Sequence, residues 1–523
     1  MLEEMIGLAL SICSLFAADT PSVGSNSQTL LEDTNFENEN EAEISFINKE
    51  YDDNYGETVL ENFLRSGSSP HLTNFDGCRN NSKVLKTFWK CLRTNLSIII
   101  VSIFPIGFAI LLVYVSINTV YSCMELWRHN MTEPFFLKRV ELFGDGVLWL
   151  IVSLWFPLTM IILFGWKEFK AKYFSTIFIA VIISEFVVII KLILFQFNVY
   201  SLYGYYMYIS YFMYWTSLLS STFVILKNIR AGRPSISCSN FHISALVLIQ
   251  FIFCILLSYV YLYVIIHGFL SVRRNLYKFL IATSSPLMTF IPALLCFHMA
   301  LRRSSEVIQP GRSFVLVYVI RGGVIFVYRT MQTNFKSIWI FIGLSLFSAV
   351  LNFLKKATQQ IRFNMWKRLV STLKMNSRCF QRLQVLPWNT AHARRLKADL
   401  EIQDILFEYN TLVLSQAFFI CYQLQNFDIA TLPLLYELLK RIAIGVSIDF
   451  IFNCLSIFMQ MYYYNIPIGR VWNKFWKRHL SANIIVVVLI IAHLGGQFAA
   501  VFRWNFQVSG DTKSYVVRNC SLF

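Results

Sequence analysis

Charge is what this sequence has little of. Only 15% of its 523 residues are Asp, Glu, Lys or Arg, whereas a soluble globular domain contains about 25%. The chain is 56% hydrophobic and has a mean hydropathy of +0.53. So much apolar surface would aggregate in water, so the composition excludes a soluble globular protein. It indicates a polytopic membrane protein whose first partner is the lipid bilayer.

The motifs that mark metal centres and catalytic sites are also missing. The 11 Cys are scattered and contain no Cys-x-x-Cys pair, so neither a zinc site nor a disulfide scaffold is indicated. There is no His-x-x-x-His, no phosphate-binding glycine loop and no nucleophile elbow. We therefore expect no enzyme activity, no metal and no cofactor. The net charge of +16 does not indicate nucleic-acid binding, because the basic residues sit at the ends of apolar runs.

Long apolar runs are what the sequence does have. A transmembrane helix needs about 20 apolar residues, and eleven runs approach or exceed that length. They lie at 95–122, 146–166, 173–195, 203–226, 243–268, 279–301, 313–328, 337–354, 412–424, 442–464 and 482–503. We expect an all-α membrane helix bundle of about eleven spans, within a range of seven to eleven. The run at 313–328 is the weakest, because Arg321-Gly-Gly interrupts it.

The basic residues predict the orientation, because cytoplasmic loops are enriched in Lys and Arg. Every even-numbered run ends on a basic loop, which places the N-terminus in the cytoplasm. The sequons at Asn130 and Asn519 then fall outside and are candidate glycosylation sites. Eight bases disagree, because they fall in loops predicted to be external: Arg128, Lys138, Arg139, Arg273, Arg274, Lys278, Arg329 and Lys336. Three acids, Glu125, Glu133 and Glu141, partly balance the first three of them.

The two ends of the chain are polar. Residues 1–94 include an acidic, Asn-rich stretch, for which we expect a disordered cytoplasmic tail. Residues 504–523 are expected to form an extracellular tail.

Four polar residues inside the predicted spans are candidate site residues. A charge at the bilayer centre costs about 2.5–3.5 kcal/mol on insertion scales, so each needs a reason. Asp449 and Asn453 are four residues apart and share a helical face, whereas Glu185 and Arg321 lie in other spans. One interpretation is an ion or ligand path through the bundle. The other is a set of buried, paired groups or side chains that snorkel to the membrane surface.

The polar interval at 355–410 separates two apolar runs and is expected to be a cytoplasmic segment. From Arg394 to Asn410 its pattern predicts a helix that continues into the ninth run. Together with Gln497-Phe498 near the end of the last run, this arrangement resembles the invertebrate gustatory and odorant receptor family of seven-transmembrane chemoreceptor channels. In that family the last helix carries Thr-Tyr, five residues, then Gln-Phe. Here Ile490 and Ile491 stand in place of Thr-Tyr.

The resemblance covers 243–503, which holds seven of the eleven runs, with 355–410 as its cytoplasmic segment. Residues 95–233 would then be an additional four-helix membrane segment, or the chain would join two neighbouring receptor genes. Membership implies a ligand-gated cation channel in the plasma membrane, a homo- or hetero-oligomer with four subunits that meet through 355–410. It also implies that Gln497 and Phe498 line the pore and that a small-molecule ligand enters from outside.

Two other functions remain open. The eleven runs and the intramembrane charges also suit a polytopic transporter or a lipid-handling protein. A seven-helix G-protein-coupled receptor would have its N-terminus outside, against the charge pattern.

Overall fold

The computed structural model describes residues 81–116, 135–197, 207–232, 238–272, 274–302, 307–335, 337–376, 390–426 and 431–508. Within these ranges every regular element is helical. Their bounds are α4 (Asn81–Ser116), α6 (Phe135–Phe164), α7 (Trp166–Lys172), α8 (Ser175–Gln196), α9 (Met207–Gly232), α10 (Asn240–Val260), η2 (Tyr261–Ile266), α11 (His267–Ser271), α12 (Asn275–Ser284), η3 (Ser285–Thr289), α13 (Phe290–Arg302), η5 (Pro310–Arg312), α14 (Val315–Thr333), α15 (Ile338–Ala357), α16 (Gln359–Asn376), α17 (Ala391–Asn426), α18 (Thr431–Tyr463) and α19 (Ile468–Val508).

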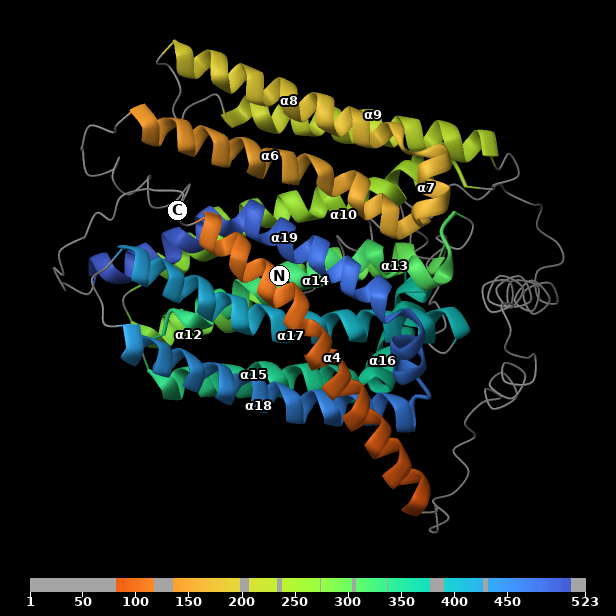
Figure 1. Ribbon diagram of the computed structural model, residues 1–523. Coiled ribbons are helices and arrows are strands. Elements are labelled where there is room, and N and C mark those ends of the chain that lie inside the picture. Colours follow the sequence, from red (N-terminus) through yellow and green to blue (C-terminus); the bar gives the residue numbers. More distant parts are fainter. Residues whose placement is uncertain are drawn as a thin grey trace.

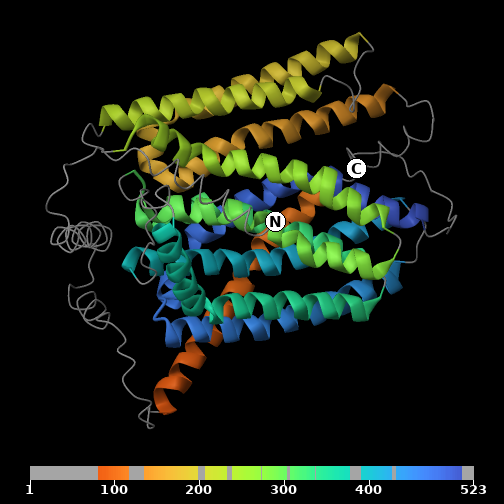
Figure 2. The same cartoon turned by 180° about the vertical axis from the view of Figure 1, so that it is seen from behind.

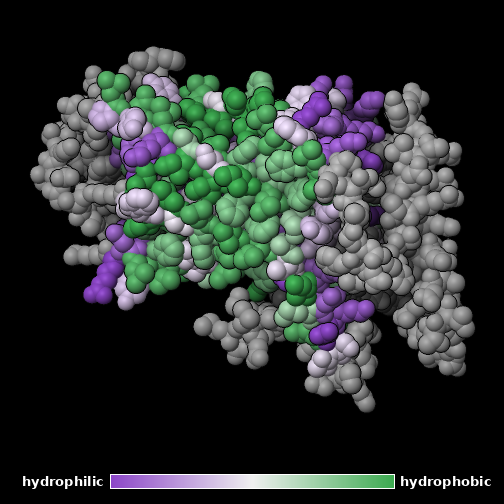
Figure 3. Space-filling model, turned by 90° about the horizontal axis from the view of Figure 1, so that it is seen from below, coloured by the Kyte–Doolittle hydropathy of each residue, from purple (hydrophilic) through white to green (hydrophobic). Residues whose placement is uncertain are grey.

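Eleven stretches of this part of the chain are long and apolar enough to cross a membrane, which confirms the expected all-α bundle. Two of them are composite: α10, η2 and α11 form one, and α12, η3 and α13 form another. An apolar band lies between polar ends on the face shown in Figure 3. The protein is therefore built as a multi-pass membrane protein.

The long helices lie side by side, with α8 and α9 at one edge of the bundle and α15 and α18 at the opposite edge (Figures 1 and 2). Helix α17 lies between them and packs against α4, α14, α18 and α19. Helix α4 crosses the bundle obliquely (Figure 1) and packs on α17, α18 and α19. The first span thus contacts helices of the 243–503 unit. The division of the chain into 95–233 and 243–503 stays a prediction.

One end of the bundle gathers α7, α16 and the C-terminal ends of α9 and α15, at the right of Figure 1. We call it the basic end. It carries exposed or half-buried bases, namely Lys167, Lys170, Lys172, Lys227, Lys355, Arg362, Lys367, Arg368, Arg470, Lys474 and Lys477. The enrichment of bases at this end predicts that it faces the cytoplasm. The side of the membrane on which the N-terminus lies stays a prediction.

Helix α17 is continuous from Ala391 to Asn426, as predicted for the stretch that leads into the ninth span. Residues 391–410, assigned from sequence to a cytoplasmic segment, are nearly all buried among neighbouring helices. Two other boundaries differ from the expected ones. Helix α4 starts at Asn81, ahead of 95, and α19 continues to Val508, beyond 503. Asn130 and Asn519 lie outside the described residues.

The seventh span is the least apolar of the eleven candidate spans, as expected, with a mean hydropathy of 1.2, yet α14 runs unbroken from Val315 to Thr333. The space around its two adjacent glycines differs. A Cβ on Gly322 would lie 2.7 Å from the ring of Phe407 on α17, whereas a Cβ on Gly323 would meet nothing within 4 Å. Gly322 therefore permits the close approach of α14 to the central helix, which is a common use of small residues between membrane helices.

This contact predicts different costs for two neighbouring substitutions. Gly322→Ala should destabilise the protein by about 1–3 kcal/mol, because the buried Phe407 ring must move. Gly323→Ala is the matched control and should be neutral or slightly stabilising, since Ala favours helix over Gly by about 1 kcal/mol. Thermal unfolding in detergent compares the two. Equal melting temperatures would contradict the packing role of Gly322.

Candidate functional site

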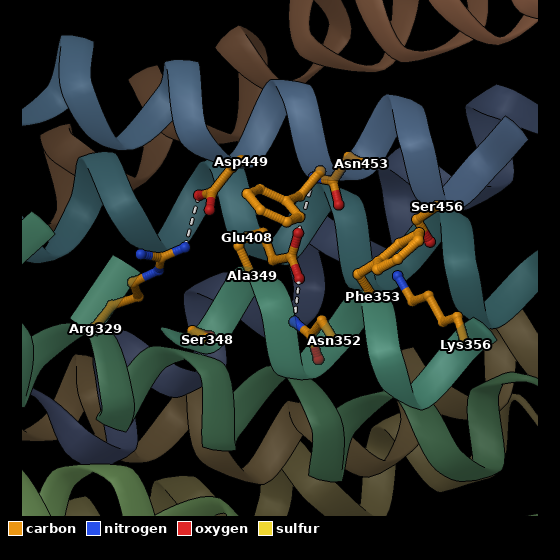
Figure 4. A pocket seen from close by; sticks show the side chains of 11 residues that line it. Arg329, Ser348, Ala349, Asn352, Phe353, Lys356, Glu408, Asp449, Asn453 and Ser456 are labelled. Atoms are coloured by element: carbon orange, nitrogen blue, oxygen red, sulfur yellow. Dashed lines mark hydrogen bonds and ion pairs between the residues drawn. The ribbon is translucent and has the colours of Figure 1, made fainter. Parts of the chain in front are cut away.

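A polar cleft lies where α14, α15, α17 and α18 meet (Figure 4). It encloses about 260 Å³ of empty space, its open mouth included. Helices α15 and α18 contribute most of its lining, and α14 and α17 contribute one charged side chain each. The lining residues are Arg329, Ser348, Ala349, Asn352, Phe353, Lys356, Glu408, Asp449, Phe452, Asn453 and Ser456.

The first charged group of the cleft is an ion pair between α14 and α18. Arg329 Nη2 lies 2.6 Å from Asp449 Oδ2, and each side chain is only 3% exposed. Arg329 Nη1 also donates to Gln332 Oε1 at 3.0 Å, and Gln332 Nε2 donates to the Phe341 carbonyl at 2.9 Å. The guanidinium of Arg329 is thus held by a second hydrogen bond besides the ion pair, and such additional hydrogen bonds help a buried pair to offset its desolvation.

Glu408 supplies the second carboxylate of the cleft, from α17. Its Oε1 accepts from Asn352 Nδ2 at 2.7 Å and its Oε2 accepts from Asn453 Nδ2 at 2.8 Å. The residue is 5% exposed. Among the described residues, no Lys, Arg or His forms an ion pair with it. Glu408 is therefore a buried carboxyl held by two neutral amides.

A third charged group continues the row toward the basic end. Lys356 Nζ lies 2.5 Å from Glu401 Oε1, and Ser456 Oγ donates to the same oxygen at 3.2 Å. Both cations that line the cleft, Arg329 and Lys356, are thus already matched by a carboxylate. Glu408 is the acid that is left with uncharged partners.

The predicted site residues are only partly brought together. Asp449 and Asn453 both face the cleft (Figure 4), which joins them as their spacing suggested. Arg321 lies elsewhere and pairs with Asp404 on α17 at 2.8 Å. Glu185 is exposed on α8 and does not line this cleft. Gln497 and Phe498 fall in α19, but their side chains lie outside the described part of the chain.

Most of the charged groups in this row are not predicted from the sequence. The prediction that Arg329 lies in an external loop is wrong, because the residue lies in α14 and is 2% exposed. Arg329 is therefore no longer one of the bases that contradict the predicted orientation. A signal for the acids did exist: Glu401, Asp404 and Glu408 are spaced i, i+3, i+7 and share one helical face. Their charge nevertheless predicts a cytoplasmic segment, because a sequence pattern does not show which helices cover that face.

A second ionic cluster lies on α17 and α19, centred on Asp399. Arg395 Nε and His479 Nε2 each lie 3.0 Å from the Asp399 carboxylate, and Arg478 Nη2 lies 4.0 Å away. Gln403 Nε2 donates to the His479 carbonyl at 2.9 Å. Asp399 and His479 are fully buried. The contacts of Asp399 and Gln403 with His479 and Arg478 join α17 to α19.

The Glu408 cleft is the better candidate for function. Because the 260 Å³ includes open solvent, its enclosed part has room for only about one water molecule, far less than a pocket that holds an organic ligand. Across the described residues, no group of His, Cys, Asp and Glu has the arrangement of a metal site. The cleft therefore suits water, a proton or a small ion better than a drug-sized molecule.

Comparisons with known proteins leave the family open. No family model, no curated protein and no solved structure matches this chain.

Proposed function

We propose that this chain is a polytopic transporter and that the cleft around Glu408 is its ion-coupling site, with the proton as the coupling ion. The observation that carries the proposal is the environment of Glu408: a carboxyl buried within the membrane bundle, lining a polar cleft, with neutral partners. Ionisable residues inside membrane spans commonly mark ion pathways and proton relays.

The amide partners suit a carboxyl that changes its protonation state. An Asn side chain carries both two N–H donors and a carbonyl acceptor. Asn352 and Asn453 can therefore donate to the carboxylate, and after a flip of the amide either can accept from the carboxylic acid. A Lys or Arg partner could only donate and would favour the charged form alone. Arg329 and Lys356 form their ion pairs with Asp449 and Glu401, so neither pairs directly with Glu408, although both attract its carboxylate from a distance.

The proposal ranks above a receptor channel because of where the charges lie. The row lies among four helices of one chain and needs no second subunit to complete it. From Ala482 to His493, α19 has no exposed side chain, whereas the resemblance implies a last helix that lines a pore between subunits. A chemosensory receptor channel remains the second candidate, favoured by the continuous helix α17 that leads into the ninth span.

The proposal predicts a charge movement that depends on Glu408 and needs no known substrate. A proton that enters the cleft from water crosses part of the membrane field. A rapid pH jump on proteoliposomes attached to a solid-supported membrane should give a transient current. Glu408→Gln should reduce the displaced charge at least tenfold, because it removes the proton-binding group. Glu185→Gln, which changes an exposed intramembrane carboxyl in the same way, should leave the current unchanged.

The outcomes separate the two candidates. A transient that survives in Glu408→Gln, or no transient in correctly folded wild-type protein, would rule out the coupling site. Sustained currents evoked by tastants that change in Gln497→Ala but not in Glu408→Gln would instead support the receptor channel.

A further inference from the structure

Helix α16 has an apolar surface that the rest of the described chain leaves uncovered. Ile361 is 60% exposed, Met365 is 64% exposed and Leu369 is 39% exposed. They are spaced by four residues, so they cover about 80° of the helix circumference and form one stripe. Val370, on the other side of the helix, is buried. The helix thus presents one apolar stripe outward while another side faces the protein.

All the charged residues of this helix are basic. The sequence of α16, QQIRFNMWKRLVSTLKMN, contains four basic residues and no Asp or Glu. Arg368 and Arg362 flank the stripe on its two sides, about 20° beyond Ile361 and about 20° beyond Leu369 on a helical wheel. Arg362, Lys367 and Arg368 are all exposed. Long basic side chains at the rim of an apolar stripe can place their stems on apolar surface and their charges in a polar layer.

The fold holds α16 across the end of the bundle. Helix α15 ends at Ala357 and is followed by Thr358, whose backbone is not helical (φ −89°, ψ 12°). Figures 1 and 2 both show α16 running across the ends of the long helices at the basic end. Arg362 Nη2 donates to the Lys355 carbonyl and Tyr464 Oη donates to the Ala357 carbonyl at 2.7 Å. Burial raises the pKa of the Tyr464 phenol, so this donor keeps its proton.

We propose that α16 is an interfacial helix that binds anionic phospholipids of the leaflet at the basic end. Its apolar stripe would enter the boundary between headgroups and acyl chains, and its bases would meet the negative headgroups. The position fits this role, because α16 directly follows a candidate span that ends on Lys355-Lys356. Amphipathic helices with a basic polar side bind at this depth. Juxtamembrane bases strengthen the binding of such a helix when the membrane surface is anionic.

Charge complementarity favours a lipid over a second copy of this chain. A second copy of this chain would bring the same all-basic helix against itself and would be repelled. A headgroup layer of phosphatidylserine offers negative charge to Arg362, Lys367 and Arg368 at once, and acyl chains directly beneath it cover Ile361, Met365 and Leu369.

Site-directed fluorescence quenching in the full-length protein tests this inference. A bimane label on Met365→Cys, in a background with the other cysteines replaced, is followed in phosphatidylcholine bilayers that contain trace spin-labelled lipid. Spin-labelled phosphatidylserine should quench the label more strongly than spin-labelled phosphatidylcholine. Adding Lys367→Gln with Arg368→Gln should reduce this preference about tenfold. Lys167→Gln with Lys170→Gln removes the same charge from α7 at the same end and should leave the preference intact.

Each other result overturns the inference. Equal quenching by the two lipids would mean that the bases do not select anionic headgroups. Quenching by aqueous iodide without quenching by lipid would place the stripe in water. Protection from both quenchers would mean that a protein surface, such as a second copy of the chain, covers it.

Discussion

Arg329→Met should destabilise the protein by about 3–5 kcal/mol, the largest loss that we expect from a single substitution in the bundle. The substitution removes the only cation that pairs with Asp449 among the described residues, and both side chains are 3% exposed. The Asp449 carboxylate would stay largely desolvated without a paired cation. The substitution also removes the ionic link between α14 and α18. Reversible unfolding in mixed micelles measures the free energy of unfolding directly.

A double substitution separates the pair from the packing around it. Arg329→Met with Asp449→Leu removes both charges, and replacing a buried ion pair by apolar groups of similar volume is often close to neutral. We therefore expect the double variant to recover most of the stability that Arg329→Met loses. Lys227→Gln controls for the loss of a cation at an exposed position of the basic end and should change stability by less than about 0.5 kcal/mol. If Arg329→Met behaved like Lys227→Gln, the pair would contribute nothing to stability.

Asp399→Leu should cost a similar amount, about 3–5 kcal/mol. Asp399 accepts from Arg395 and His479 at 3.0 Å each, and it is fully buried. Without the carboxylate, the Arg395 and Arg478 guanidinium groups lose their shared counter-charge, and α17 loses its ionic contact with α19. The melting temperature in detergent should fall by several degrees, and proteolysis of the native protein should become faster.

The matched control for Asp399→Leu is an ion pair of the same spacing near the surface. Glu437 and Arg441 are also four residues apart, at 3.3 Å, but the Glu437 side chain is 43% exposed. Arg441 keeps its hydrogen bonds to the carbonyls of Thr333 and Phe335 when Glu437 is changed. Glu437→Gln should therefore cost no more than about 0.5 kcal/mol. Equal losses for Asp399→Leu and Glu437→Gln would contradict the role of burial.

The helices were predictable because their signal is local. A run of about 20 apolar residues crosses a bilayer whatever its neighbours are, and the eleven runs in the sequence correspond to the eleven candidate spans. The continuity of α17 was also predictable, because the stretch from Arg394 to Asn410 contains no proline or glycine. Boundaries were less accurate, as α4 and α19 show, since a polar turn can extend a membrane helix into the headgroup region.

The charged row was not predictable by the same means. Average hydropathy predicts that Glu401 and Glu408 lie in a cytoplasmic segment and Arg329 in an external loop. A charged residue lowers the mean hydropathy of the residues around it, whether its side chain is buried or exposed in the fold. Asp449 was found because apolar residues surround it on both sides along the chain. Its partner was not, since Arg329 lies 120 residues away and no local pattern joins them.

By itself the sequence determined the class of this protein, the number of its apolar spans and the continuity of its central helix, because each of these follows from the free energy of placing a short segment in lipid. Only the tertiary structure decided which polar groups share a cleft, which acid lacks a cation and which stripe of α16 stays uncovered. Those properties arise from helices that are distant in the chain and adjacent in space. A buried charge is tolerated only when such a neighbour stabilises it.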